Sequence, residues 1–164
     1  MNTVLAHGCF DLLHLGHIRH LQEARKLGDR LVVSVTGDSH VAKGIGRPHF
    51  SAEQRADALR ALACVDQVII NDAPTAVPII AQVRPNIYVK GIDYRGFVGG
   101  TSGLLKEEHE AIEAVGGTIH FTTSEKFSSS RLINEAKFPP EVMYYLESAK
   151  IAGFKGKILA AFDA

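Results

Sequence analysis

Five short apolar runs occur in the first 123 residues of this 164-residue chain, and each is followed by a loop or a helical pattern. The runs are TVLAHG, RLVVSVTGD, VDQVIIND, NIYVKG and GTIHFTT. Apolar strands that alternate with helices are typical of βαβ units, which build a parallel sheet. The sequence therefore predicts an α/β fold, a five-stranded parallel sheet with helices on both faces.

The segments between the runs carry the patterns of four helices. Apolar residues at every third position from Ile18 to Leu27 predict a helix that begins just after His17 and ends at Gly28. SAEQ at residues 51–54 has the form of a capping box and predicts the start of a second helix. TAVPIIAQV and LLKEEHEAIEAVGG predict two more helices that cover the sheet.

The chain predicts one domain over residues 1–135, followed by a segment of different character. Residues 136–164 carry Pro139-Pro140 near their start and fall outside the strand rhythm. They predict a C-terminal helical extension or a linker that leads to a further domain.

Charge and cysteine content narrow the partners and the compartment. Lys and Arg together number 18, as do Asp and Glu, so no net charge attracts nucleic acid or an anionic membrane. A phosphate site must therefore be local. Two unpaired cysteines and no apolar run long enough for a signal peptide or membrane span predict a cytoplasmic protein. Cys9 is interpreted as a small buried residue rather than a reactive thiol.

HGCFDLLHLGH, residues 7–17, directly follows the first predicted strand. Ligands bind beyond the carboxyl ends of strands in open α/β sheets, and Gly16 lets the backbone approach a ligand where a helix begins. His14 and His17 are three residues apart, so both rings face one side of the opening turn and donate to phosphate oxygens. This pattern favours phosphate chemistry over helix-capping or interior histidines, and it predicts no metal ligands.

Three other stretches carry residue types that bind phosphates or substrates. HVAKGIGRPHFSAEQR places Lys43, Arg47 and Arg55 in a cationic loop that closes over a triphosphate or stays a solvated surface loop. FSSSRLI, residues 127–133, places three serines at a predicted helix N-terminus, and plain capping explains one serine but not three. YVKGIDYRG, residues 88–96, ends the fourth strand at the ligand edge and fits a substrate contact or a strand-end turn.

GCFDLLHLGH resembles the opening signature G-x-F-D-x-x-H-x-G-H of the cytidylyltransferase-like nucleotidyltransferases, and the resemblance extends over residues 3–134. FSSSRLI is similar to the second signature of that family. VKGIDY is similar to a segment in the nucleotidyltransferase domain of ADP-heptose synthases. Glycerol-3-phosphate cytidylyltransferases, the other group that the chain resembles, carry a different, GDDW-like version of this segment. The resemblance implies a Rossmann-like domain that joins a nucleoside triphosphate to a phosphorylated acceptor, releases pyrophosphate and uses the Mg²⁺ that the triphosphate carries.

The resemblance also implies roles for individual residues. The catalytic residues that it implies, which contact the triphosphate, are His14, His17, Lys43 and Arg55. The residues that it implies for nucleotide binding are Gly8, Cys9, Phe10, Asp11, Gly16, Lys90, Gly91, Asp93, Ser128, Ser129 and Ser130. Those that we expect to bind the second substrate are Arg47, Tyr94 and Arg131.

The predicted function is transfer of AMP or CMP from ATP or CTP to a phosphorylated sugar or polyol. Two alternatives stay open: adenylyl transfer in cofactor biosynthesis, of the flavin or pantetheine-phosphate type, and a nucleotide-binding module without catalysis. Dimers are common among similar enzymes, and similar domains are fused to sugar kinases. A homodimer and a fusion to a kinase domain through residues 136–164 are therefore expected.

Overall fold

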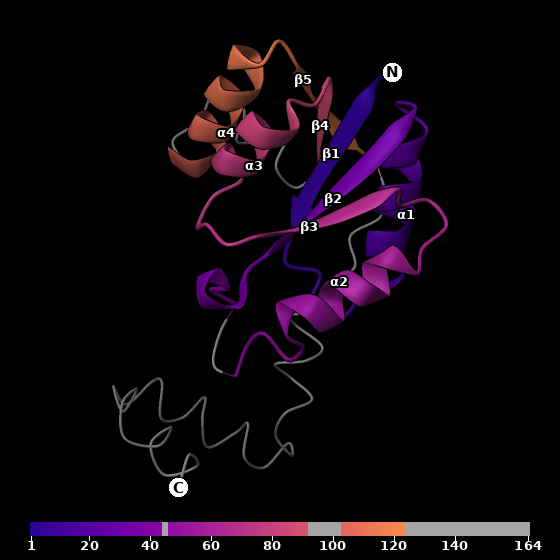
Figure 1. Cartoon of the computed structure of the whole chain (residues 1–164), viewed down its shortest axis with the longest axis vertical. Helices are drawn as coiled ribbons and strands as arrows, with labels where there is room; N and C mark the ends of the chain where they lie inside the picture. Colours follow the sequence, from indigo (N-terminus) through magenta and orange to yellow (C-terminus); the bar gives the residue numbers. More distant parts are fainter. Residues whose placement is uncertain (44–45, 92–102, 124–164) are drawn as a thin grey trace, which may run out of the picture. The chain divides into compact units, whose positions relative to one another are not determined.

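The computed structural model describes residues 1–43, 46–91 and 103–123, in which strands and helices alternate (Figure 1). The strands are β1 (Thr3–Gly8), β2 (Arg30–Thr36), β3 (Gln67–Asn71), β4 (Ile87–Gly91) and β5 (Thr118–Thr122). The α-helices are α1 (Leu15–Arg25), α2 (Ala52–Arg60), α3 (Val77–Val83) and α4 (Gly103–Ala114), and a short 3₁₀ helix, η1, spans Asp38–His40. Each predicted apolar run contains one of the five strands.

The strands form one parallel sheet in the order β3-β2-β1-β4-β5. The chain runs outward from β1 to β3 and then returns to place β4 on the other side of β1. In open α/β sheets, ligands bind outside the carboxyl ends of the strands at such a reversal of strand order. The predicted α/β fold is confirmed, and its topology marks the carboxyl ends of β1 and β4 as the place for a ligand.

Side chains that alternate along the strands build a core on each face of the sheet. Val4 and Ala6 of β1 join a cluster with Leu21 of α1 and Leu59 of α2, whereas Leu5 joins the opposite cluster. That opposite cluster also contains the helix residues Ile79, Ile80 and Ile112. Figure 1 shows α1 and α2 on one side of the sheet and α3 and α4 on the other, so the helices cover both faces as predicted.

The local signals at the helix ends were right for α2 and wrong for α1. Ser51 and Gln54 form the predicted capping box, with N–O distances of 3.0 and 3.3 Å. The first helix, however, begins at Leu15 and ends at Arg25 instead of reaching Gly28. A Cβ on Gly28 would lie 2.6 Å from the carbonyl oxygen of Asn2. This glycine therefore serves the close approach of two backbone segments rather than a helix cap.

The predicted extension over residues 136–164, and with it the predicted domain boundary, lies outside the described residues. In the part of the chain that the structure describes, no helix is long and apolar enough to cross a membrane.

Candidate functional site

The segment that joins β1 to α1 has an unusual backbone. Phe10 and Leu12 adopt φ angles of 51° and 60°, a left-handed conformation that bulky residues rarely adopt. Such a conformation costs on the order of 1–3 kcal/mol per residue and persists only where surrounding contacts hold it. Phe10 is 6% exposed, and a Cβ on Gly8 would lie 3.1 Å from its ring. Gly8 therefore makes room for a buried aromatic ring at the end of β1.

The side chain of Arg55 on α2 binds this loop through hydrogen bonds, in an arrangement that we call the Arg55 clamp. Its guanidinium donates to the carbonyl oxygens of Cys9 (2.6 Å), Thr36 (2.9 Å) and Phe50 (2.9 Å) and to Oδ1 of Asp38 (2.6 Å). The Arg55 side chain is 1% exposed. The clamp joins the loop after β1, the end of β2 and the entry to α2. The implied contact of Arg55 with a phosphate stays a prediction, since its N–H groups here donate to the protein.

Asp11 ties the same loop to residues 46–50. Its carboxylate accepts hydrogen bonds from the backbone amides of His49 (2.9 and 3.0 Å) and Phe50 (3.1 Å) and from Nε of Arg47. Both side chains of the Asp11–Arg47 ion pair are buried. Burial alone would raise the pKa of Asp11, but the hydrogen bonds from His49, Phe50 and Arg47 outweigh it and lower the pKa. An ionised Asp11 therefore fixes the backbone beside the histidines.

His14 and His17 lie at the start of α1 as a stacked pair. Their ring centroids are 3.7 Å apart with an interplanar angle of 24°. His14 is the N-cap residue, and its Nδ1 accepts from the amides of Gly16 (3.1 Å) and His17 (3.4 Å). A neutral ring that accepts at Nδ1 carries its proton on Nε2. Helix capping and phosphate binding are thus compatible functions of His14, because capping uses Nδ1 and places the ring proton on Nε2.

Burial and neighbouring charges keep both rings neutral near pH 7. Burial lowers the pKa of His14. Burial, followed by the charges of His14, His20 and Lys43, lowers the pKa of His17 to about 3. The ring of Phe10 contacts that of His17 edge to face, with 5.2 Å between the ring centroids, and this contact fixes the plane of the His17 ring. Two neutral N–H donors in fixed orientations suit an anion whose charge changes during a reaction.

The three cations of the predicted phosphate loop have different surroundings. Lys43 is exposed, and its charge acts on His17. The side chains of Arg47 and Arg55 are buried in ion pairs with Asp11 and Asp38. Of these three residues, Lys43 is therefore the one whose charge reaches solvent, while the arginines shape the backbone of the loop.

The carboxyl end of β4 carries a buried ion pair. Nζ of Lys90 lies 2.6 Å from Oε2 of Glu108 on α4 and 5.1 Å from the centre of the Tyr88 ring. Next to it on β1, Nδ1 of His7 lies 3.0 Å from Oγ of Ser34. Burial and, to a lesser extent, the Lys90 charge lower the pKa of His7 to about 4. Polar groups thus continue along the ligand edge from β2 through β1 to β4, where Gly91 ends the strand.

Among the described residues near the site that carried no sequence prediction are His7, His20 and Glu108. His20 follows His17 at the spacing that separates His17 from His14, so helical periodicity was a usable signal. Glu108 had no such signal, because its pairing with Lys90 depends on how α4 packs on the sheet. The predicted residues that lie outside the described ranges are Asp93, Tyr94, Ser128, Ser129, Ser130 and Arg131.

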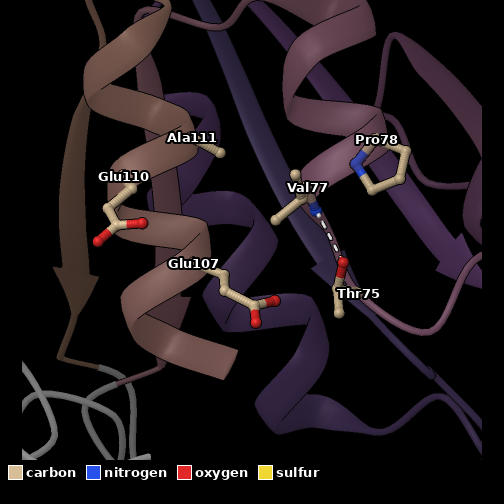
Figure 2. Close-up of a pocket in the computed structure, with 6 residues that line it drawn as sticks. All are labelled: Thr75, Val77, Pro78, Glu107, Glu110 and Ala111. Atoms are coloured by element: carbon tan, nitrogen blue, oxygen red, sulfur yellow. Dashed lines mark hydrogen bonds between the residues drawn. The ribbon is translucent and has the colours of Figure 1, made fainter. Parts of the chain in front are cut away.

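A groove between α3 and α4 is lined by none of the residues that the sequence predicted for the site (Figure 2). Its lining consists of Thr75, Val77, Pro78, Glu107, Glu110 and Ala111. The charged side chains in this lining are both carboxylates, which repel a phosphate. Neither in this groove nor elsewhere among the described residues is a group of three or more His, Cys, Asp or Glu arranged to hold a metal ion. The groove is therefore not part of the candidate phosphate site.

The parallel sheet, the reversal of strand order beside β1 and the stacked H-x-G-H histidines define the class of protein as a Rossmann-like domain of the nucleotidyltransferase type. Comparison with known proteins identifies the family, because the family model described as "Cytidylyltransferase-like" matches residues 5–135. The chain belongs to the cytidylyltransferase-like family.

Curated relatives and a solved structure agree with this family. Bifunctional protein HldE of Streptomyces coelicolor is 51% identical over 107 residues, which make up 64% of this chain and 23% of that protein. Bifunctional protein HldE of Koribacter versatilis is 42% identical over 135 residues, or 80% of this chain and 26% of that protein. The lipopolysaccharide core biosynthesis protein from Thermoplasma volcanium is 33% identical, with a TM-score of 0.60 over 78% of this chain and 99% of that one. The chain thus spans about a quarter of the length of the curated relatives that it matches.

Proposed function

We propose that this domain transfers AMP or CMP from ATP or CTP to a phosphorylated sugar or polyol and releases pyrophosphate. The observation that carries the proposal is the stacked pair His14 and His17 at the start of α1, beside the reversal of strand order. The family supports nucleotidyl transfer. A phosphorylated sugar as acceptor is supported by similarity to a protein named for lipopolysaccharide core biosynthesis, since that core is a saccharide.

In the proposed reaction a phosphate oxygen of the acceptor attacks the α-phosphorus of the nucleotide. The bond from that phosphorus to the bridging oxygen breaks, and pyrophosphate leaves with the bonding electrons. His14, which accepts helix amides at Nδ1, presents the proton on Nε2 to a phosphate oxygen. His17 supplies a second neutral donor and Lys43 a positive charge, so negative charge that develops in the transition state is spread over the protein. The chain supplies no nucleophile in this mechanism, and catalysis is mainly positional.

The buried side chains of Arg55, Asp11 and Arg47 would support this chemistry by holding the backbone that carries the histidines. The Arg55 clamp and the Asp11–Arg47 pair hold the left-handed backbone that leads into His14. Because a small displacement of a catalytic group costs much of its effect, a rigid loop is part of the proposed mechanism. Arg55 and Asp11 are positioning residues in this scheme.

Mg²⁺ enters this scheme with the triphosphate. Both carboxylate oxygens of Asp11 already accept hydrogen bonds from Arg47, His49 and Phe50. The ion would therefore be bound by phosphate oxygens and water, an environment that Mg²⁺ prefers, rather than by Asp11. Its chemistry would be to neutralise charge on the leaving pyrophosphate.

The predictions about partners concern a second domain and a second copy of the chain. The relatives are called bifunctional and are much longer than this chain, which supports fusion to a second catalytic domain such as a sugar kinase. A homodimer stays a prediction. Adenylyl transfer to a cofactor precursor and a nucleotide-binding role without catalysis remain the alternatives that the experiment below separates.

The test is calorimetric titration of the purified chain with ATP and with CTP in Mg²⁺, followed by a pyrophosphate-release assay. We expect one nucleotide to bind and then to release pyrophosphate with a heptose phosphate for ATP or a polyol phosphate for CTP. Pyrophosphate release with flavin mononucleotide or pantetheine phosphate alone would favour the cofactor alternative. Binding without release from any acceptor would favour the non-catalytic one.

A further inference from the structure

Polar side chains follow one another at three-residue spacing along α1. After His14 and His17 come His20 and Glu23, the last of them two residues before the helix ends at Arg25. Three residues turn a helix by about 300°, so each position is rotated by about 60° from the one before. His20 and Glu23 face the carboxyl end of β5, as their contacts show. Neither His20 nor Glu23 has a role in the function proposed above.

His20 and Glu23 bind α1 to β5 through hydrogen bonds. Nδ1 of His20 lies 2.7 Å from Oγ1 of Thr122, the last residue of β5. The carboxylate of Glu23 accepts from the Thr123 amide (3.0 and 3.1 Å) and from its hydroxyl (3.4 Å). Two adjacent residues at the end of one strand thus contact two positions one turn apart on the helix that carries the histidine pair.

The Thr122 hydroxyl extends this connection to β4. It donates to the carbonyl oxygen of Lys90 over 3.3 Å, and Thr122 is fully buried. Because a hydroxyl has a single hydrogen, Nδ1 of His20 must then donate to Oγ1. The hydrogen bonds run in one direction, from α1 through β5 to the strand end where Lys90 and Gly91 lie.

We propose that His20 is a positioning residue, which through Thr122 fixes the histidine pair of α1 relative to the carboxyl ends of β4 and β5. The inference rests on the proposed function and deepens it. A nucleotide in this site would span the two regions, with its phosphates at His14 and His17 and its remainder toward Lys90. Its α-phosphorus is well placed only if the two regions keep a fixed separation, and displacement by about 1 Å is enough to cost much of the rate.

The experiment removes the connection with almost no change of shape. Thr122→Val replaces the hydroxyl by a methyl group in a strand, and Thr122→Ser is the matched control that keeps the hydroxyl. His20→Leu removes the ring, and His20→Asn keeps an N–H donor near the position of Nδ1. Each variant is tested for melting temperature, nucleotide Kd, kcat and KM in the pyrophosphate assay with the full chain.

We expect Thr122→Val and His20→Leu each to lower kcat by about tenfold or more while nucleotide Kd changes little. Thr122→Ser and His20→Asn should retain most of the activity. The double variant His20→Leu/Thr122→Val should be no slower than His20→Leu alone, because both changes break one connection. Unchanged kcat in Thr122→Val and His20→Leu, or losses that multiply in the double variant, would overturn the proposal.

A second measurement separates this proposal from the proposed function. Imidazole nitrogen signals of His14 and His17 in NMR spectra of the nucleotide-free chain should shift in Thr122→Val but not in Thr122→Ser. If the unmodified chain releases no pyrophosphate with any nucleotide and acceptor, the proposed function fails, and these signals alone decide the role of His20. Signals that stay in place would overturn that role.

Discussion

Replacing Arg55 by Met tests whether this arginine is a structural clamp or a phosphate ligand. Met is nearly as long and keeps the apolar stem, but it removes all the donors of the guanidinium. Four acceptors lose their partner: the carbonyl oxygens of Cys9, Thr36 and Phe50 and the Asp38 carboxylate. The substitution therefore removes the buried partner of an ion pair whose other partner is half exposed, together with three hydrogen bonds to the backbone.

The expected cost follows from how exposed these acceptors are. Removing one partner of a fully buried ion pair costs about 3–5 kcal/mol because the other charge stays buried. Asp38 is 47% exposed and recovers hydration, so most of the cost comes from the three backbone carbonyl oxygens, and we expect about 3 kcal/mol in total. For a chain of this size, that loss lowers the melting temperature by roughly 6–12 °C. Thermal unfolding followed by circular dichroism, with urea unfolding at 25 °C, measures both quantities.

The control is Arg60→Met on the same helix. Arg60 pairs with Glu53 and Asp57 at the protein surface, and its removal should leave the unfolding curve unchanged. If Arg55→Met unfolds like the unmodified chain yet no longer binds nucleotide, the clamp interpretation is refuted and Arg55 is a phosphate ligand. Loss of stability with nucleotide binding restored at low temperature would support the clamp.

Three further predictions concern the histidines and the exposed cation. His17→Ala should slow pyrophosphate release on the order of a hundredfold without changing thermal unfolding. The control His109→Ala on α4 should change neither the rate of pyrophosphate release nor thermal unfolding. Normal turnover in His17→Ala would remove His17 from the site. The pKa of His7 in the folded chain is lowered to about 4, so between about pH 6.5 and 4 the His7 ring is protonated only in the unfolded chain. The free energy of unfolding therefore decreases as the pH is lowered through that window, by up to about 1.4 kcal/mol per pH unit. Urea midpoints at pH 7 and pH 5 should therefore differ less in His7→Gln, and an equal difference would contradict this. Lys43→Gln should weaken nucleotide binding and its salt dependence at constant melting temperature, and titrations at two salt concentrations that give the unmodified slope would exclude Lys43 from the site.

The fold was predictable because buried parallel strands are continuous apolar runs in the sequence. The end of α1 was not, since a glycine that ends a helix and one that lets two backbones approach carry the same letter. Gly28 does the second, against Asn2. Sequence patterns report local conformation well only where the cause is local, as in the capping box at Ser51.

In the candidate site, too, the features with a local cause were predictable from the sequence and those that depend on distant contacts were not. The spacing of His14 and His17 is local, and it predicted that both rings lie on one side of the opening turn. The partners of Asp11 are 36 to 39 positions away along the chain, and those of Arg55 are 5 to 46 positions away. Most of these partners are backbone groups, which have no sequence signature. The sequence could place charged residues at the ligand edge, but whether each charge faces a ligand or the protein depends on tertiary packing.

The central position of β1 has a consequence for how the chain acquires its site during synthesis. Thr3 and Asn86 exchange two hydrogen bonds although 83 positions separate them, and β4 pairs with β1 only through residues that follow Asn86. Contacts so distant in sequence form late, after the nearer β1–β2 pairing. A nascent chain that has emerged only to residue 86 carries the complete H-x-G-H signature, yet one edge of β1 is still open to pairing with other chains. The H-x-G-H signature is thus synthesised before the β4 residues that close the neighbouring edge of β1.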